Sequence, residues 1–77
     1  MNETINYITS DLYLTAFLKV KGYKFKVEKN KLKYKFIFED SAEILADVND
    51  YLTESGLCEP LAYTNAIKNI KNLLYNL

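Results

Sequence analysis

The sequence predicts an α+β domain in which an antiparallel β-hairpin is covered on one face by three helices, in the order α-β-β-α-α. Residues 12–20 are apolar on nearly every side, and residues 44–52 are apolar at helical spacing. Residues 23–38 instead alternate apolar and polar side chains, which is the period of a strand. A chain of 77 residues has room for one core, so we expect a single domain over residues 1–77.

The composition is that of a folding chain, since 49% of the residues are hydrophobic and 14% are aromatic. Cys58 is the single cysteine, which excludes an intrachain disulfide and fits a reducing cytoplasm. The sequence shows no signal peptide and no apolar run of the roughly 20 residues that cross a bilayer. We therefore expect a cytoplasmic protein without a membrane segment, whose residues 1–8 form a flexible N-terminal segment.

The first helix is expected to begin at Ser10 or Asp11, because both are good N-cap residues. It runs through Val20, and Gly22 is expected to end it. Only Thr15 and Lys19 interrupt its apolar surface, so this helix should be largely buried.

The hairpin follows, with a tight turn expected near Lys29-Asn30 because asparagine tolerates positive φ. One face is predicted to be apolar and the other basic. The apolar face would carry Tyr23, Phe25 and Val27 from the first strand and Leu32, Tyr34, Phe36 and Phe38 from the second. The opposite face would carry Lys24, Lys26 and Glu28, then Lys31, Lys33, Lys35 and Ile37.

Two amphipathic helices complete the prediction. The second should start after Asp40, whose spacing to Glu43 suggests a capping box, and end at Gly56. The third should open at Glu59-Pro60, with proline in its favoured first turn. It is expected to bury Leu61, Ala66, Ile67, Ile70, Leu73 and Leu74.

Several short motifs resemble a pattern in a family of small bacterial and phage proteins classed as a domain of unknown function. These motifs are Thr9-Ser10-Asp11-Leu12-Tyr13-Leu14, Ala16, Lys21-Gly22-Tyr23, Phe36-Ile37-Phe38-Glu39-Asp40, Pro60 and Leu74-Tyr75. The resemblance spans residues 9–75 and implies a bacterial or phage cytoplasmic protein. It carries no activity and no binding residues that could be assigned to this chain.

The residues that catalysis requires do not form a recognisable set. The chain has no histidine, which is the usual general base and the commonest metal ligand. Cys58 has no visible base beside it and is interpreted as an inert thiol, and Gly22 and Gly56 stand apart at helix ends rather than in a phosphate-binding loop. We therefore expect no enzyme, no cofactor and no metal site.

The strongest asymmetry is a concentration of lysines. Eight of the ten lie in residues 19–35, where they face only Glu28 and leave a local charge of +7, although the net charge of the chain is zero. With the expected turn, Lys26 faces Lys33 and Lys24 faces Lys35, and such pairs of like charge destabilise a hairpin. Phosphates approaching this face would relieve that repulsion, and a two-stranded ribbon fits the major groove of DNA. The alternative is that the lysines only protect exposed strands from pairing with other chains.

The lysines therefore support the hypothesis of a non-enzymatic module that binds nucleic acid. Phosphate contacts would come from Lys24, Lys26, Lys33 and Lys35, with Lys29 and Lys31, and also Lys19 and Lys21, widening the patch. Contacts of this kind position a protein but read little sequence.

Acidic side chains form the opposite pattern, with seven acids and no base in residues 39–59. Glu43, Asp47, Asp50 and Glu54 are spaced as one stripe along a helix. The stripe is interpreted as a solvated face, a contact for a basic protein or a mimic of phosphates. It supports the alternative hypothesis of a protein-interaction module, such as a phage or mobile-element protein that docks on a host or defence protein through this helix or the hairpin edge.

Two further expectations concern partners. A two-stranded sheet is only marginally stable by itself, so we expect it to pair through an edge with a second copy and form a homodimer. Asn65, Asn69, Asn72 and Asn76 lie along one side of the third helix, where asparagine could read adenine, but we interpret them as ordinary surface residues.

Overall fold

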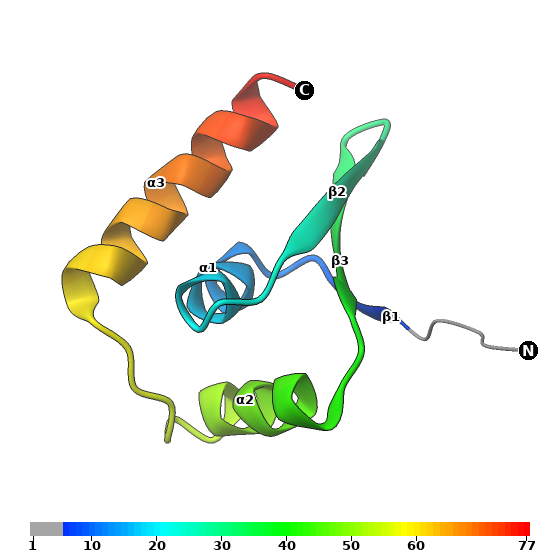
Figure 1. Ribbon diagram of the computed structural model, residues 1–77. Helices are drawn as coiled ribbons and strands as arrows, with labels where there is room; N and C mark the ends of the chain where they lie inside the picture. Colours follow the sequence, from blue (N-terminus) through cyan, green and yellow to red (C-terminus); the bar gives the residue numbers. More distant parts are fainter. Residues whose placement is uncertain (1–5) are drawn as a thin grey trace, which may run out of the picture.

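The computed structural model describes residues 6–77 and confirms the α+β class. The elements are β1 (Asn6–Thr9), α1 (Leu12–Val20), β2 (Phe25–Asn30), β3 (Lys33–Glu39), α2 (Ala42–Leu52) and α3 (Pro60–Tyr75). Figure 1 shows the three helices on one side of the sheet, with α1 between the sheet and α3. The antiparallel sheet has the strand order β1-β3-β2, so β3 is its centre.

Strand β1 is the element that the sequence did not predict. Asn6–Thr9 pairs with the end of β3, so that Tyr7 lies opposite Phe38 and Thr9 opposite Phe36. Residues 6–8, which we expected to be flexible, are therefore part of the sheet, while residues 1–5 of that segment lie outside the described residues. Tyr7 and Thr9 are half-buried on the helix side, and Asn6 and Ile8 are exposed on the other.

The register of the hairpin differs from the prediction by two residues at the turn. Phe25 pairs with Phe38 and Val27 with Phe36, and this register puts the two-residue turn at Lys31-Leu32 rather than at Lys29-Asn30. Both registers keep the apolar side chains on one face, because they differ by an even number of residues. In the observed register the fully buried Phe36 and Phe38, rather than Leu32 and Tyr34, lie opposite Val27 and Phe25. The preference of asparagine for a turn was the weaker signal.

The turn itself is made by residues that seldom occupy it. Lys31 has a φ of 58°, in the left-handed region that costs a side-chain-bearing residue about 1–2 kcal/mol. Leu32, which we expected on the apolar face, is 92% exposed. Figure 1 shows this turn projecting away from α1 and α2.

Helix α1 is held at both ends as the sequence predicts. The Asp11 side chain accepts hydrogen bonds from the backbone N–H groups of Tyr13 and Leu14, so Asp11 is the N-cap. At the other end Gly22, with a φ of 105°, donates to the Lys19 carbonyl, and Tyr23 donates to that of Leu18. These two bonds form a Schellman motif, in which the left-handed residue is best a glycine.

The core is built around α1. Five consecutive residues of this helix, 14–18, are buried, and the Thr15 hydroxyl is satisfied by donating to the Asp11 carbonyl. The other buried apolar side chains come from β3, α2 and α3: Phe36, Phe38, Ile44, Val48, Ala66 and Ile70.

Helix α2 is shorter than expected at both ends. Ser41 is its N-cap and accepts from the Ile44 N–H, whereas the buried Oδ1 of Asp40, the residue that we expected to cap it, has no hydrogen-bond partner among residues 6–77. The helix ends at Leu52, before the positive φ of 60° at Glu54. Serine caps because its short side chain reaches the third residue of the first turn.

Helix α3 begins as expected, with Glu59 as N-cap and Pro60 in the first turn. The buried side of this helix differs slightly from the predicted one. Leu61 and Leu73 are exposed, whereas Tyr63 packs against the core. The side that faces the core is made of Tyr63, Ala66, Ile67, Ile70 and Leu74.

The loop before α3 approaches the core at Gly56. A Cβ atom placed there would lie 2.6 Å from the buried Phe17 ring. No side chain fits at that distance, so glycine is needed for close approach rather than for its backbone freedom.

Candidate functional site

Six lysines of the hairpin make up the surface that we call the lysine hairpin: Lys24, Lys26, Lys29, Lys31, Lys33 and Lys35. All six side chains are exposed. No ion pair, taken as a nitrogen–oxygen distance up to 4.0 Å, joins any of them to a carboxylate of residues 6–77. The ammonium groups of this surface are therefore not neutralised by the described part of the chain.

The arrangement of these lysines differs from the predicted one. Lys26 lies opposite Ile37, Lys33 opposite Asn30 and Lys35 opposite Glu28. The predicted pairs of facing lysines, Lys26 with Lys33 and Lys24 with Lys35, are wrong because the turn lies two residues later. The hairpin thus carries no lysines that face each other across the strands. The argument that phosphates would relieve repulsion between such lysines therefore does not apply.

Five of these six lysines fall into two groups. Lys26, Lys33 and Lys35 point from the sheet face that the helices leave uncovered, as the pairing shows. Lys29 lies on the other face near the tip, where its ammonium is 5.8 Å from the centre of the Tyr34 ring, and Lys31 lies in the turn. Lys19 and Lys21, at the end of α1, are exposed as well, and the Lys21 ammonium is 5.3 Å from the Phe17 ring centre.

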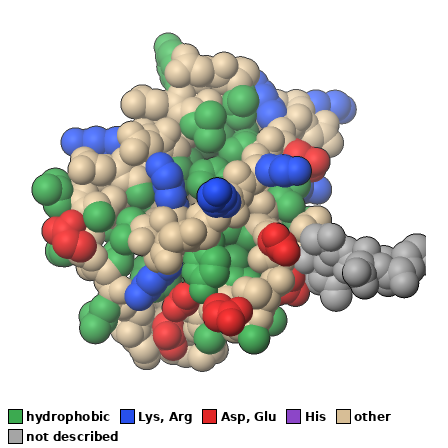
Figure 2. Space-filling model, in the orientation of Figure 1, with side chains coloured by type: hydrophobic (Ala, Val, Ile, Leu, Met, Phe, Trp, Pro, Cys, Tyr) green, Lys and Arg blue, Asp and Glu red, His purple; other side chains and the backbone are tan. Residues whose placement is uncertain are grey.

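The charges of the molecule are segregated. In Figure 2 most acidic side chains of this face gather in the lower part, the region of α2 in Figure 1, and most basic side chains lie above them. The hairpin turn points away from α2. Helix α2 carries Glu43, Asp47 and Asp50 and no base. The hairpin tip and the acidic helix therefore lie in regions of opposite charge.

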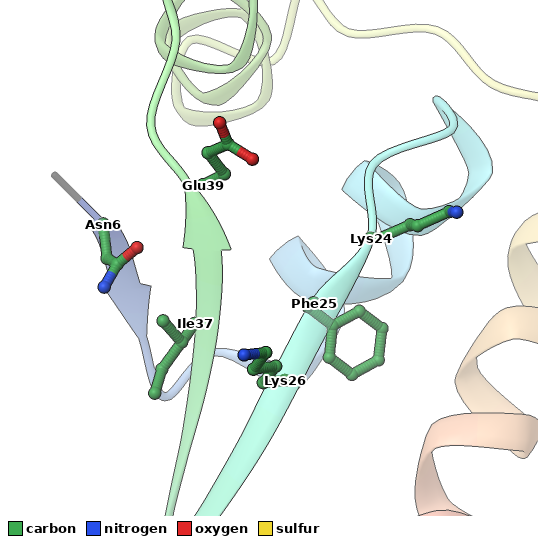
Figure 3. Close-up of a pocket in the computed structure, with 6 residues that line it drawn as sticks. All are labelled: Asn6, Lys24, Phe25, Lys26, Ile37 and Glu39. Atoms are coloured by element: carbon green, nitrogen blue, oxygen red, sulfur yellow. The ribbon is translucent and has the colours of Figure 1, made fainter. Parts of the chain in front are cut away.

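A shallow hollow of about 370 Å³ lies on the uncovered face of the sheet. Its lining residues are Asn6, Lys24, Phe25, Lys26, Ile37 and Glu39. Figure 3 shows the Lys24 side chain directed away from Glu39, with Ile37 between the strands that carry Asn6 and Lys26. Because a carboxylate and an aliphatic side chain share the hollow with the lysines, it does not form a concentrated anion site.

The predicted acidic stripe is only partly present. Glu43 and Asp50 are exposed on α2, but Glu54 lies beyond the end of the helix. Asp47 is half-buried and accepts a hydrogen bond of 2.6 Å from the Tyr23 hydroxyl. One of the four carboxylates therefore joins α2 to the segment before β2, a role that the sequence did not indicate.

The Tyr23–Asp47 bond should make stability depend on pH. Donation to the Asp47 carboxylate, together with burial, raises the pKa of Tyr23 from 10.0 to about 12. A folded-state pKa above the unfolded value gives stability that is present below pH 10 and lost as the pH rises toward 12. Tyr23→Phe is expected to cost about 1.5 kcal/mol of unfolding free energy at pH 8 and to flatten the decline between about pH 10 and 12.

Urea titrations at several pH values would measure both effects. Burial also raises the pKa of Tyr63, to about 12, and that of Tyr51, so part of the decline will persist in Tyr23→Phe. Tyr75→Phe is the matched control, because Tyr75 is 90% exposed and should leave the profile unchanged. A Tyr23→Phe profile that runs parallel to that of the unaltered protein would contradict this account.

Cys58 lies half-buried beside Phe17, Tyr51 and Tyr63. The neighbouring Tyr63 hydroxyl donates to the Tyr13 carbonyl at 3.2 Å and so helps to hold α3 on α1. In the described part of the chain, no group of three or more His, Cys, Asp and Glu residues is placed to hold a metal ion. No helix of residues 6–77 has the length and apolar character to cross a membrane.

Comparisons with known proteins place the chain in a family but give no function. A search of curated proteins and a search of solved structures find no significant match. A family model described as a domain of unknown function, DUF5659, matches residues 4–76. Since the match covers nearly the whole sequence, the chain belongs to this family of domains of unknown function.

Proposed function

We propose that this chain is a non-enzymatic module that binds nucleic acid through the lysine hairpin. The observation that carries the proposal is the position of six exposed lysines, unpaired within residues 6–77, on a hairpin whose tip points away from the acidic helix α2. Lys24, Lys26, Lys33 and Lys35 contact phosphates along the ribbon, and Lys29 and Lys31 do so at its tip.

Such contacts recognise the backbone of a nucleic acid and not its bases. Glu28, opposite Lys35, and Glu39, beside the hollow, lower the positive potential of the uncovered face. The tip lacks such acids: Lys29, Lys31 and Lys33 surround it, with only Asn30 and Leu32 between them. The contacts at the tip should therefore be stronger than those near Lys24.

Salt dependence tests this function. With four to six phosphate contacts, log K for a fluorescently labelled duplex should fall with log salt concentration at a slope of about −4 to −5 between about 50 and 200 mM. Fluorescence anisotropy measures the affinity at each salt concentration, and retention on heparin is a rapid companion assay. Failure to bind at the lowest salt concentration would contradict the proposal and favour the second candidate described next.

The second candidate is a protein-interaction module, favoured by a different surface. Leu45 and Leu52 share one side of α2 and are 48% and 67% exposed, and the same helix carries the exposed Glu43 and Asp50 on another side. A basic partner with apolar side chains, such as a host or defence protein met by a phage or mobile-element protein, would complement this helix. The same proposal includes the hairpin edge, because β2 pairs on one side only within residues 6–77.

Pairing of two β2 edges would also give the homodimer that the sequence suggests. Light scattering would then report twice the chain mass of 9.0 kDa. A bacterial or phage origin and a cytoplasmic location belong to the same set of proposals, and they rest on the resemblance described above and on the single cysteine.

A further inference from the structure

Leu32 is a single apolar side chain at the basic tip of the hairpin. It is 92% exposed, more than any other large hydrophobic residue in the described part of the chain. Isolated exposed leucines are common on protein surfaces and need no explanation by themselves. This one is unusual in its place, because Lys31 and Lys33 flank it and the turn projects beyond α1 and α2.

The residues of the turn itself indicate that the tip has a function. The two central residues of such a turn are commonly glycine, asparagine or aspartate. Here a lysine adopts a φ of 58°, and the next residue is an aliphatic side chain without contact to the core. Strained backbone and broken local rules concentrate at functional positions. The turn is therefore less stable than one made of glycine or asparagine, and it places a cation and an apolar side chain next to each other on the surface.

We propose that Leu32 is a wedge that inserts between base pairs of duplex DNA while Lys29, Lys31 and Lys33 hold the phosphates around it. The proposal rests on the function proposed above and adds the substrate class, double-stranded DNA that can be kinked. Proteins that bind the minor groove often insert a leucine or another apolar side chain between base steps, which unstacks them and bends the duplex. The bend brings further phosphates toward Lys26 and Lys35 on the uncovered face.

A membrane surface would also attract an apolar tip among lysines, but the structure favours DNA. A single leucine buries too little apolar area to anchor a protein in a bilayer. The lysines continue along both strands from Lys24 to Lys35, which suits a track of phosphates better than the insertion of one tip.

Deformable DNA is the probe for this proposal. Duplexes with TA steps unstack and kink easily, whereas A-tracts are stiff. Two short duplexes of equal length, one with central TA steps and one A-tract, carry a donor and an acceptor dye at their ends. The protein is expected to bind the TA duplex about tenfold more tightly and to raise energy transfer in it by bending.

Leu32→Ala should lose the preference for TA steps and the rise in energy transfer while keeping the salt dependence of binding. Leu32→Met should retain both properties, because methionine is also a wedge residue. Leu57→Ala is the matched control, since Leu57 is 82% exposed and lies in the loop between α2 and α3. The three variants change only the exposed side chains of Leu32 and Leu57, so they should fold like the parent.

The outcomes separate the wedge from the proposed function. Salt-dependent binding without bending, with equal affinity for both duplexes and for Leu32→Ala, would overturn the wedge and leave the proposed function standing. No binding to either duplex at low salt would overturn both. Binding to vesicles of phosphatidylcholine and phosphatidylserine, without binding to either duplex, would overturn the wedge in favour of a membrane surface.

Discussion

Phe38→Ala is expected to lower the free energy of unfolding by about 3–5 kcal/mol, because the residue lies at the centre of the core. Phe38 is fully buried on β3, the middle strand, where it faces Phe25 on one side and Tyr7 on the other. Its ring centre is 5.5 Å from that of Phe25. Truncation removes these contacts and leaves a cavity that the sheet and α1 cannot both close.

This loss is a large part of the total free energy of unfolding of a domain of this size. At about 0.05–0.15 kcal/mol per residue, the whole chain is stable by about 4–12 kcal/mol. Urea denaturation followed by circular dichroism would measure the change. Ile8→Ala is the control on the other face of the same sheet, where the side chain is 54% exposed, and it should cost less than about 1 kcal/mol. Equal losses for the two variants would contradict the assignment of the core to the helix side.

Reversing two charges near the tip should have the largest effect on nucleic-acid binding. Lys33→Glu with Lys35→Glu is expected to weaken binding to duplex DNA about a hundredfold at 50 mM salt and to make the salt slope less steep by about 2. The two side chains are exposed on the uncovered face of β3, so the substitutions change charge with little change of packing.

The matched control is Lys68→Glu with Lys71→Glu on α3. Both of these side chains are exposed, and the change of net charge is identical. If binding depends on the lysine hairpin, the α3 variant should keep most of its affinity and its full salt slope, as anisotropy titrations would show. Equal weakening in the two variants would mean that the total charge decides binding and that the hairpin has no special part.

The sequence predicts the helices better than it predicts how the strands pair. Asp11, Gly22 and Pro60 mark helix ends through local backbone chemistry, and the structure confirms each of them. The alternation of residues 23–38 correctly predicts which aromatic side chains face the helices, because a strand has only two faces. Such features depend on neighbours in the sequence and are therefore visible in it.

What the sequence could not predict depends on contacts between distant residues. Strand β1 has only four residues, and it exists because β3, some thirty residues later, pairs with it. The turn lies at Lys31-Leu32 because Phe38 and Phe36, rather than Tyr34 and Leu32, pair with Phe25 and Val27, and Asn30, which looked like a turn residue, ends a strand instead. The lysines were correctly expected to be exposed. The residues predicted to lie opposite them were wrong, because these depend on the register of the strands.

The position of β3 in the sheet also protects the chain from misassembly. Tyr34, Phe36, Ile37 and Phe38 form a segment of high β-propensity, the kind that stacks into amyloid when its backbone is free to pair. Here β2 pairs along the whole segment and β1 covers its other edge from Phe36 onward, while Lys33 and Lys35 act as charged gatekeepers beside it. The short first strand is thus a cover for the most aggregation-prone stretch of the molecule, and opening it would expose that stretch to other copies of the chain.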